Sequence, residues 1–179
     1  YGDAGMVVTD DAALAERLRS LRNYGKVDRD RLVEIGMNSR LDELQAALLR
    51  VKLLFLPAWN QRRRNLARRY LEGLEGLPLK LPLWDGSESH CFHLFVVECE
   101  DREGLRRHLE KRGIESAVHY PLPLHLQPPL REVQASPAPC PAAERAARKV
   151  LSLPLYPQMR EEEIDQVIEA VRDFFAYAN

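Results

Sequence analysis

Apolar side chains recur at helical spacing through the first 74 residues and predict three helices there. Their intervals of three, four or seven residues place them on one face of an α-helix. The second helix ends near Pro57, because the residue before a proline avoids helical geometry. The three groups are Leu14, Leu18 and Leu21, then Leu41, Leu44, Leu48, Val51 and Phe55, then Trp59, Leu66, Tyr70 and Leu74.

A short apolar run from Met6 to Thr9 stands before the first helix and predicts a buried strand entered from a glycine-rich turn. Asp10 and Asp11 follow it, where negative charge suits a helix N-terminus. A natural N-terminus rarely begins inside such a unit, so we expect the chain to be part of a longer polypeptide.

Strands and helices alternate beyond residue 76, as is typical of an α/β domain. Segments 90–99 and 114–118 predict strands, and between them a helix capped by Asp101 is expected to end at Gly113. Seven prolines between residues 121 and 141 predict a long irregular loop. A short helix over 142–150 and a final helix follow. The apolar stripe of the final helix is Ile164, Val167, Ile168, Val171, Phe174 and Phe175.

Composition narrows the classes of partner. The formal net charge is -1, so no global field attracts nucleic acid or an acidic membrane surface. No stretch approaches the roughly 20 apolar residues that a membrane-spanning helix needs. The 3 cysteines stand at irregular spacing, which argues against a disulfide framework and fits a reducing cytoplasm. We therefore expect a globular cytoplasmic protein without a membrane or nucleic-acid partner.

Three local clusters have a structural explanation. Metal-ligand residue types gather at His90, Cys91, His93 and Cys99, but spacings of two and six along one strand face do not converge on a tetrahedral ion. A core strand with cysteines acting as small hydrophobes is favoured, and no metal site is predicted.

The arginines between Arg62 and Arg69 could contact phosphates, yet acidic residues follow within helical reach, which favours a solvated helix face. Residues 161–163 are glutamates that suit the start of the last helix.

Two loop segments carry groups suited to an anionic ligand. In segment 36–40, the Asn38 amide and the Arg40 guanidinium can donate to phosphate, although capping of the next helix by Asn38 or Ser39 is the simpler explanation. In segment 119–125, two imidazoles and a phenol occupy a proline-stiffened loop after a predicted strand. Such a loop can line a pocket for a polar or phosphorylated ligand, or both histidines can be ordinary surface or core residues.

Taken in order, these segments resemble the DegT/DnrJ/EryC1/StrS family of sugar aminotransferases across essentially the whole chain. The matching blocks are residues 2–9, 21–25, 36–47, 113–114, 119–121, 123–125 and 151–155. The resemblance implies the α/β architecture of fold-type-I aminotransferases. Residues 1–57 would end a large cofactor-binding domain, and residues 58–179 would form a small C-terminal α/β domain. It also implies a homodimer with a shared active site.

The family reaction moves an amino group from glutamate or glutamine to a nucleotide-linked keto sugar, with pyridoxal phosphate as carrier, held as a Schiff base by a lysine. The resemblance places that lysine just upstream of Tyr1, so this chain is expected to hold no catalytic residue and to be inactive alone. A dehydratase, a regulatory or sensory member of the family, and a non-catalytic fragment remain alternatives.

The resemblance also implies roles for five residues. Asn38 would reach the cofactor phosphate of the neighbouring subunit, and Arg40 would support that phosphate or the loop. His119 and Tyr120 would line the nucleotide-sugar pocket, with His125 as a further candidate. Ser39 departs from the family, which often has an aromatic residue there.

Overall fold

The structure is a computed structural model that describes residues 4–133 and 139–176. The chain divides into two compact units, with the boundary between Leu56 and Pro57. Assignment of these units to the large and small domains of an aminotransferase stays a prediction. Among the helices of the described residues, none is both long and apolar enough to cross a membrane.

The first helix, α1 (Ala12–Leu21), begins where the two aspartates predict it. Asp11 Oδ1 accepts from the amides two and three residues ahead, at 2.9 and 3.0 Å, and so satisfies two of the open N-terminal donors. The strand predicted at residues 6–9 is wrong for the described part of the chain. Met6 and Val8 are 88% and 82% exposed, and no described segment pairs with them as the neighbour that a strand requires.

The second helix, α2 (Glu43–Leu53), is capped by Asp42, which forms a capping box with Gln45. The Asp42 amide donates to the Gln45 side chain at 3.2 Å. The simpler explanation for segment 36–40, in which Asn38 or Ser39 caps this helix, is therefore wrong. All described side chains of α2 are exposed or half-buried within this chain.

The second unit is organised around a three-stranded antiparallel sheet of order β1-β2-β3. Its strands are β1 (Leu79–Lys80), β2 (Phe95–Cys99) and β3 (Val150–Leu153). Buried and half-buried residues alternate along β2, so one face of the sheet lies in the core. In the register, Phe95 stands opposite Leu153 and Val96 opposite Ser152.

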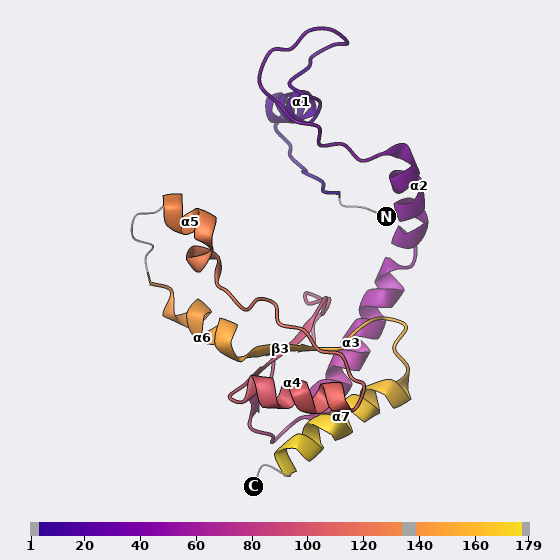
Figure 1. Cartoon of the computed structure of the whole chain (residues 1–179). Helices are drawn as coiled ribbons and strands as arrows, with labels where there is room; N and C mark the ends of the chain where they lie inside the picture. Colours follow the sequence, from indigo (N-terminus) through magenta and orange to yellow (C-terminus); the bar gives the residue numbers. More distant parts are fainter. Residues whose placement is uncertain (1–3, 134–138, 177–179) are drawn as a thin grey trace. The chain divides into compact units, whose positions relative to one another are not determined.

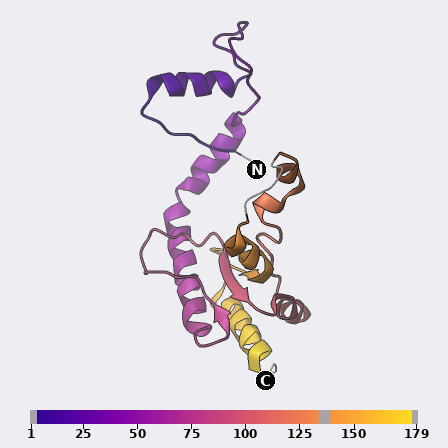
Figure 2. The ribbon, with the colours of Figure 1, turned by 90° about the vertical axis from the view of Figure 1, so that its left-hand side faces the viewer.

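Four longer helices accompany the sheet, and α3 and α7 run side by side (Figure 1 and Figure 2). They are α3 (Leu56–Gly73), α4 (Arg102–Lys111), α6 (Pro141–Lys149) and α7 (Glu161–Ala176). The predicted apolar faces of α3 and α7 enter one core together with α4, β2 and β3. Its fully buried members include Leu66, Tyr70, Leu74, Phe95, Val97, Leu105, Leu109, Leu151, Ile164 and Val171.

The strand predictions for the second unit were only partly correct. Segment 90–94 precedes β2 without joining it, and segment 114–118 makes a single antiparallel bridge, from Ala117 to Ser152. Strands β1 and β3 were not predicted. The proline-rich segment contains a 3-10 turn, η1 (Leu124–Leu126), and a short helix, α5 (Pro128–Val133), so it is not wholly irregular. One of its seven prolines, Pro137, lies outside the described residues.

Candidate functional site

The loop between α1 and α2 places Asn38 by means of its backbone. Asn38 forms an antiparallel bridge with Asn23, and the amides on either side of Asn38 each donate at 2.9 Å to a carbonyl at the end of α1. Gly25, with φ at +81°, lies buried at this crossing, and a Cβ on Gly36 would collide with its backbone. The base of the loop is therefore closed by backbone contact, which fixes where Asn38 stands.

The side chains of Asn38 and Arg40 are joined to each other. Arg40 Nε donates to Asn38 Oδ1 at 3.0 Å, and the guanidinium carbon lies 6.0 Å from the centre of the Tyr24 ring. Because a guanidinium can only donate, the oxygen of Asn38 must face it, and the Asn38 amide group points away. Within the described residues no hydrogen bond occupies that amide nitrogen, so it can donate to a ligand.

A shallow hollow of about 310 Å³ lies in the same loop, and its lining is mostly polar. Lys26, Arg29 and Arg40 contribute three positive charges to its wall, against the carboxylate of Asp28. Donors of this kind fit a phosphate. Sequence reasoning found Arg40 and missed Lys26 and Arg29, because the turn that brings them beside Arg40 depends on loop pairing rather than on any helical spacing.

The other predicted residues belong to the second unit. His119 is half-buried, and its Nδ1 lies 2.9 Å from the hydroxyl of Ser152. The rings of His119 and Tyr120 meet edge to face at 5.4 Å across a cis peptide bond, and Tyr120 is 72% exposed. The structure thus packs His119 against Tyr120 and joins His119 to Ser152, a residue that sequence reasoning did not select.

His125 lies in a different environment, beside α6. Its Nε2 lies 3.2 Å from Glu144 Oε1 in α6, and the same carboxylate oxygen accepts from the Cys140 amide at 3.3 Å. The hydrogen bond from His125 is the main reason why the pKa of Glu144 is lowered. This contact ties the proline-rich segment to α6. A role in ligand binding for His125 stays a prediction.

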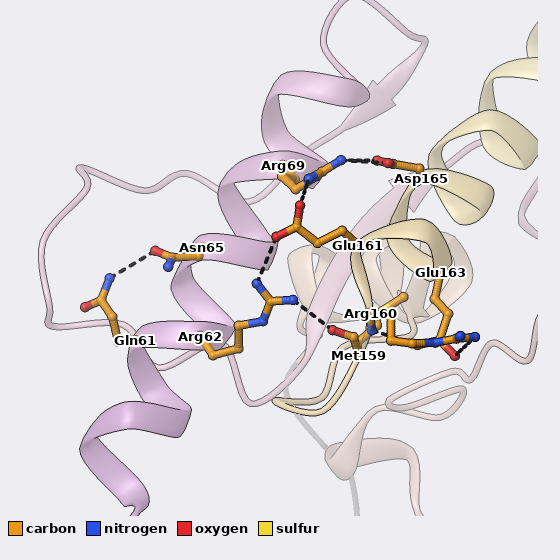
Figure 3. Close-up of polar contacts among 9 residues, drawn as sticks. All are labelled: Gln61, Arg62, Asn65, Arg69, Met159, Arg160, Glu161, Glu163 and Asp165. Carbon is orange, nitrogen blue, oxygen red and sulfur yellow. Dashed lines mark hydrogen bonds and ion pairs between the residues drawn. The ribbon is translucent and has the colours of Figure 1, made fainter.

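The arginines of α3 are not simply a solvated helix face, and that expectation was wrong. Arg69 pairs with Glu161 at 2.6 Å and with Asp165 at 2.5 Å, and Arg62 bonds Glu161 and the Met159 carbonyl (Figure 3). Arg63 reaches three backbone carbonyls, and Arg64 is buried. These side chains hold α3 against α7 and neighbouring loops, which leaves little of the cluster for an external anion.

The histidine and cysteine cluster around β2 is dispersed. Cys99 is buried in the core, while Cys91 is exposed and lies before the strand, so its predicted role as a small core hydrophobe was wrong. His90 Nδ1 accepts from the Phe92 amide at 2.8 Å. Across residues 4–133 and 139–176, no three metal-ligating side chains gather in one place.

Comparison with known proteins gives consistent results. Residues 1–172 match the DegT/DnrJ/EryC1/StrS aminotransferase family. The chain is 47% identical, over 97% of its length, to a dTDP-3-amino-3,4,6-trideoxy-alpha-D-glucose transaminase of Streptomyces venezuelae, of which it covers 46%. It spans about half the length of the curated relatives that it matches.

Two solved structures share the fold. One is S. venezuelae DesV in complex with a ketimine intermediate, with a TM-score of 0.84 and 46% identity over 93% of this chain and 45% of DesV. The other is NtdA of Bacillus subtilis with the bound cofactor PMP, with a TM-score of 0.84 and 32% identity over 94% of this chain and 41% of NtdA.

Proposed function

This chain belongs to the DegT/DnrJ/EryC1/StrS aminotransferase family, and from that premise we propose that it forms the C-terminal part of an aminotransferase acting on a nucleotide-linked keto sugar. The relative from S. venezuelae is a dTDP-3-amino-3,4,6-trideoxy-alpha-D-glucose transaminase, which supports this substrate class. Polypeptide preceding Tyr1 would supply the Schiff-base lysine. Glutamate or glutamine as donor, a homodimer and a cytoplasmic location belong to the same proposal.

The arrangement around Asn38 is the observation that carries the proposal. Its amide nitrogen is oriented by Arg40 and has no hydrogen bond within the described residues, and two further cations lie in the same loop. These donors fit the phosphate of pyridoxal phosphate, which when bound supplies an electron sink for moving the amino group. We assign Asn38 to donate to that phosphate and Arg40 to hold Asn38 in place while adding positive charge.

The half-buried imidazole of His119 and the exposed phenol of Tyr120 suit the substrate side of the site. Both groups can donate to the many oxygens of a nucleotide sugar, and their fixed edge-to-face packing limits the directions in which they do so. In the proposed enzyme these two side chains orient the sugar.

The test uses the complete enzyme that carries this chain. Asn38→Ala removes one or two charge-assisted hydrogen bonds, so we expect the Kd of pyridoxal phosphate to rise about 10- to 100-fold. Equilibrium dialysis followed by absorbance of the retained cofactor measures this constant. Asn65→Ala is the matched control, since Asn65 is an exposed asparagine of α3 bonded only to Gln61 among the described residues. Equal cofactor affinity in both variants would contradict the assignment of Asn38.

A further inference from the structure

A buried hydroxyl contacts the imidazole that the proposed function assigns to the sugar. Ser152 is 4% exposed, and its Oγ lies 2.9 Å from His119 Nδ1. We infer that Ser152 is a positioning residue that holds His119 as the Nε2–H tautomer, so that Nε2 donates to an oxygen of the nucleotide sugar. The part concerning the substrate rests on the proposed function, whereas the tautomer does not.

The backbone holds both groups in place. Along β3, Leu151 and Leu153 point into the core, so the side chain of Ser152 points to the opposite face of the sheet. The Ser152 amide donates to the Ala117 carbonyl at 2.7 Å, and the Ala117 amide donates back to the Ser152 carbonyl at 3.2 Å. Ala117 stands two residues before His119, so this bridge sets the distance between the hydroxyl and the ring.

The burial of the hydroxyl decides the direction of the hydrogen bond. Within the described residues, Ser152 Oγ has His119 Nδ1 as its hydrogen-bond partner and no other. If Nδ1 carried the proton and donated, the serine O–H would be left buried without an acceptor, at a cost that proteins generally avoid. When the serine O–H donates to a bare Nδ1, both groups are satisfied. The ring proton then stands on Nε2.

This tautomer has a consequence for binding. No hydrogen bond occupies Nε2 within the described residues, and the packing of the ring against Tyr120 restricts its rotation. His119 therefore presents one donor in a defined direction. Hydroxyl, phosphate and carbonyl oxygens of a nucleotide sugar all accept such a bond, so the orienting effect of Ser152 would reach the substrate through His119.

The first experiment reads the tautomer. Long-range 1H–15N correlation spectra of the 15N-histidine-labelled full chain, recorded at about pH 8.5, distinguish a protonated from a bare ring nitrogen. His90 is an internal reference, because its Nδ1 accepts from a backbone amide and must be bare. We expect His119 to show the His90 pattern. In Ser152→Ala we expect a mixture of tautomers, and Ser152→Thr, which keeps a hydroxyl, should restore the pattern.

Ser116→Ala is the matched control. Ser116 Oγ is also a buried serine hydroxyl, three residues from His119, but it has no hydrogen-bond partner in the described part of the chain. Its removal should leave the His119 spectrum unchanged. An Nδ1–H tautomer in the unmodified protein would overturn the inference without any variant, as would an unchanged His119 pattern in Ser152→Ala.

The second experiment measures the substrate side in the complete enzyme with a dTDP-linked keto sugar and glutamate. Ser152→Ala should raise KM for the keto sugar about three- to tenfold, the size of one misdirected hydrogen bond, and leave KM for glutamate and the affinity for pyridoxal phosphate unchanged. Altered tautomers with an unchanged KM would refute the link to the substrate. An unmodified enzyme without transaminase activity would refute the proposed function, while the spectra would still decide the role of Ser152 toward His119.

Discussion

Removal of the Arg63 guanidinium should destabilise the second unit strongly. Arg63 Nη1 lies 3.2 Å from the Phe92 carbonyl, 3.2 Å from the His93 carbonyl and 2.9 Å from the Leu155 carbonyl. These carbonyls belong to the segments before β2 and after β3. The side chain therefore fastens α3 to two loops that are far apart in the sequence.

The magnitude follows from the number of bonds. One Nη nitrogen has two hydrogens, so the three acceptors correspond to about two full hydrogen bonds from a charged donor. Each contributes about 1.5 kcal/mol at this partly buried position, so Arg63→Ala should lower the free energy of unfolding by about 3 kcal/mol. With an m-value of about 2 kcal/mol per M, the urea midpoint would fall by about 1.5 M.

Urea denaturation followed by tryptophan fluorescence is the assay. Both tryptophans, Trp59 and Trp84, belong to the second unit, so the signal reports on the unit that Arg63 stabilises. Arg68→Ala is the matched control on the same helix. The exposed Arg68 side chain makes no hydrogen bond or ion pair among the described residues, and its guanidinium carbon lies 5.3 Å from the centre of the Trp84 ring. A cation–π contact at such a site contributes about 0.5–1 kcal/mol, so the midpoint should fall by at most about 0.5 M. Equal midpoints for the two variants would refute the reasoning.

Two further predictions concern buried groups. Burial raises the pKa of Tyr70, whose hydroxyl donates to the Pro154 carbonyl at 2.8 Å. The stabilising contribution of neutral Tyr70 is fully present below the unfolded pKa of about 10 and is lost as the pH rises past it. Because about half of the unfolded tyrosine is already ionised at pH 10, the protein should lose about 1 kcal/mol more than Tyr70→Phe between pH 10 and 11 in urea titrations. Equal losses would disprove this. Burial likewise raises the pKa of the Cys99 thiol, whereas Cys91 is exposed. When the protein is treated with iodoacetamide and its peptides are analysed by mass spectrometry, Cys91 should be modified in the native state and Cys99 only in urea. Similar rates for the two thiols would show that the core face of β2 is not closed.

Helices could be predicted because their backbone hydrogen bonds join residues that are close in the sequence. The apolar stripes of α3 and α7 are visible at fixed spacings. Asp101 caps α4 as expected, and Asp11 lies at the start of α1, where its charge predicted a helix N-terminus, since both effects depend on neighbours only a few residues away. Strands depend on partners elsewhere in the chain. Segment 6–9 has the residues of a strand and no described partner, whereas β3 pairs with β2 more than fifty residues earlier.

In the candidate site, too, features set by neighbouring residues could be predicted, and contacts between distant residues could not. Asn38 and Arg40 stand two residues apart, and their donor groups together with the family resemblance were enough to mark both as candidates. It assigned the cap of α2 incorrectly, because Asp42 and Asn38 are both good capping residues and only the path of the chain decides between them. The contact between His119 and Ser152 spans 33 positions, and no spacing rule could reveal it.

The closed base of the loop between α1 and α2 separates two tasks within a short stretch of chain. Gly25 and Gly36 cannot be enlarged without forcing the backbone apart, whereas the turn beyond them, residues 27–31, is exposed and stabilised mainly by its own Asp28. Evolution or an engineer can therefore exchange that turn for one of different length or charge while the asparagine behind it keeps its position. Differences in ligand binding between related proteins would therefore lie in residues 27–31, while the backbone crossing at Gly25 and Gly36 stays the same.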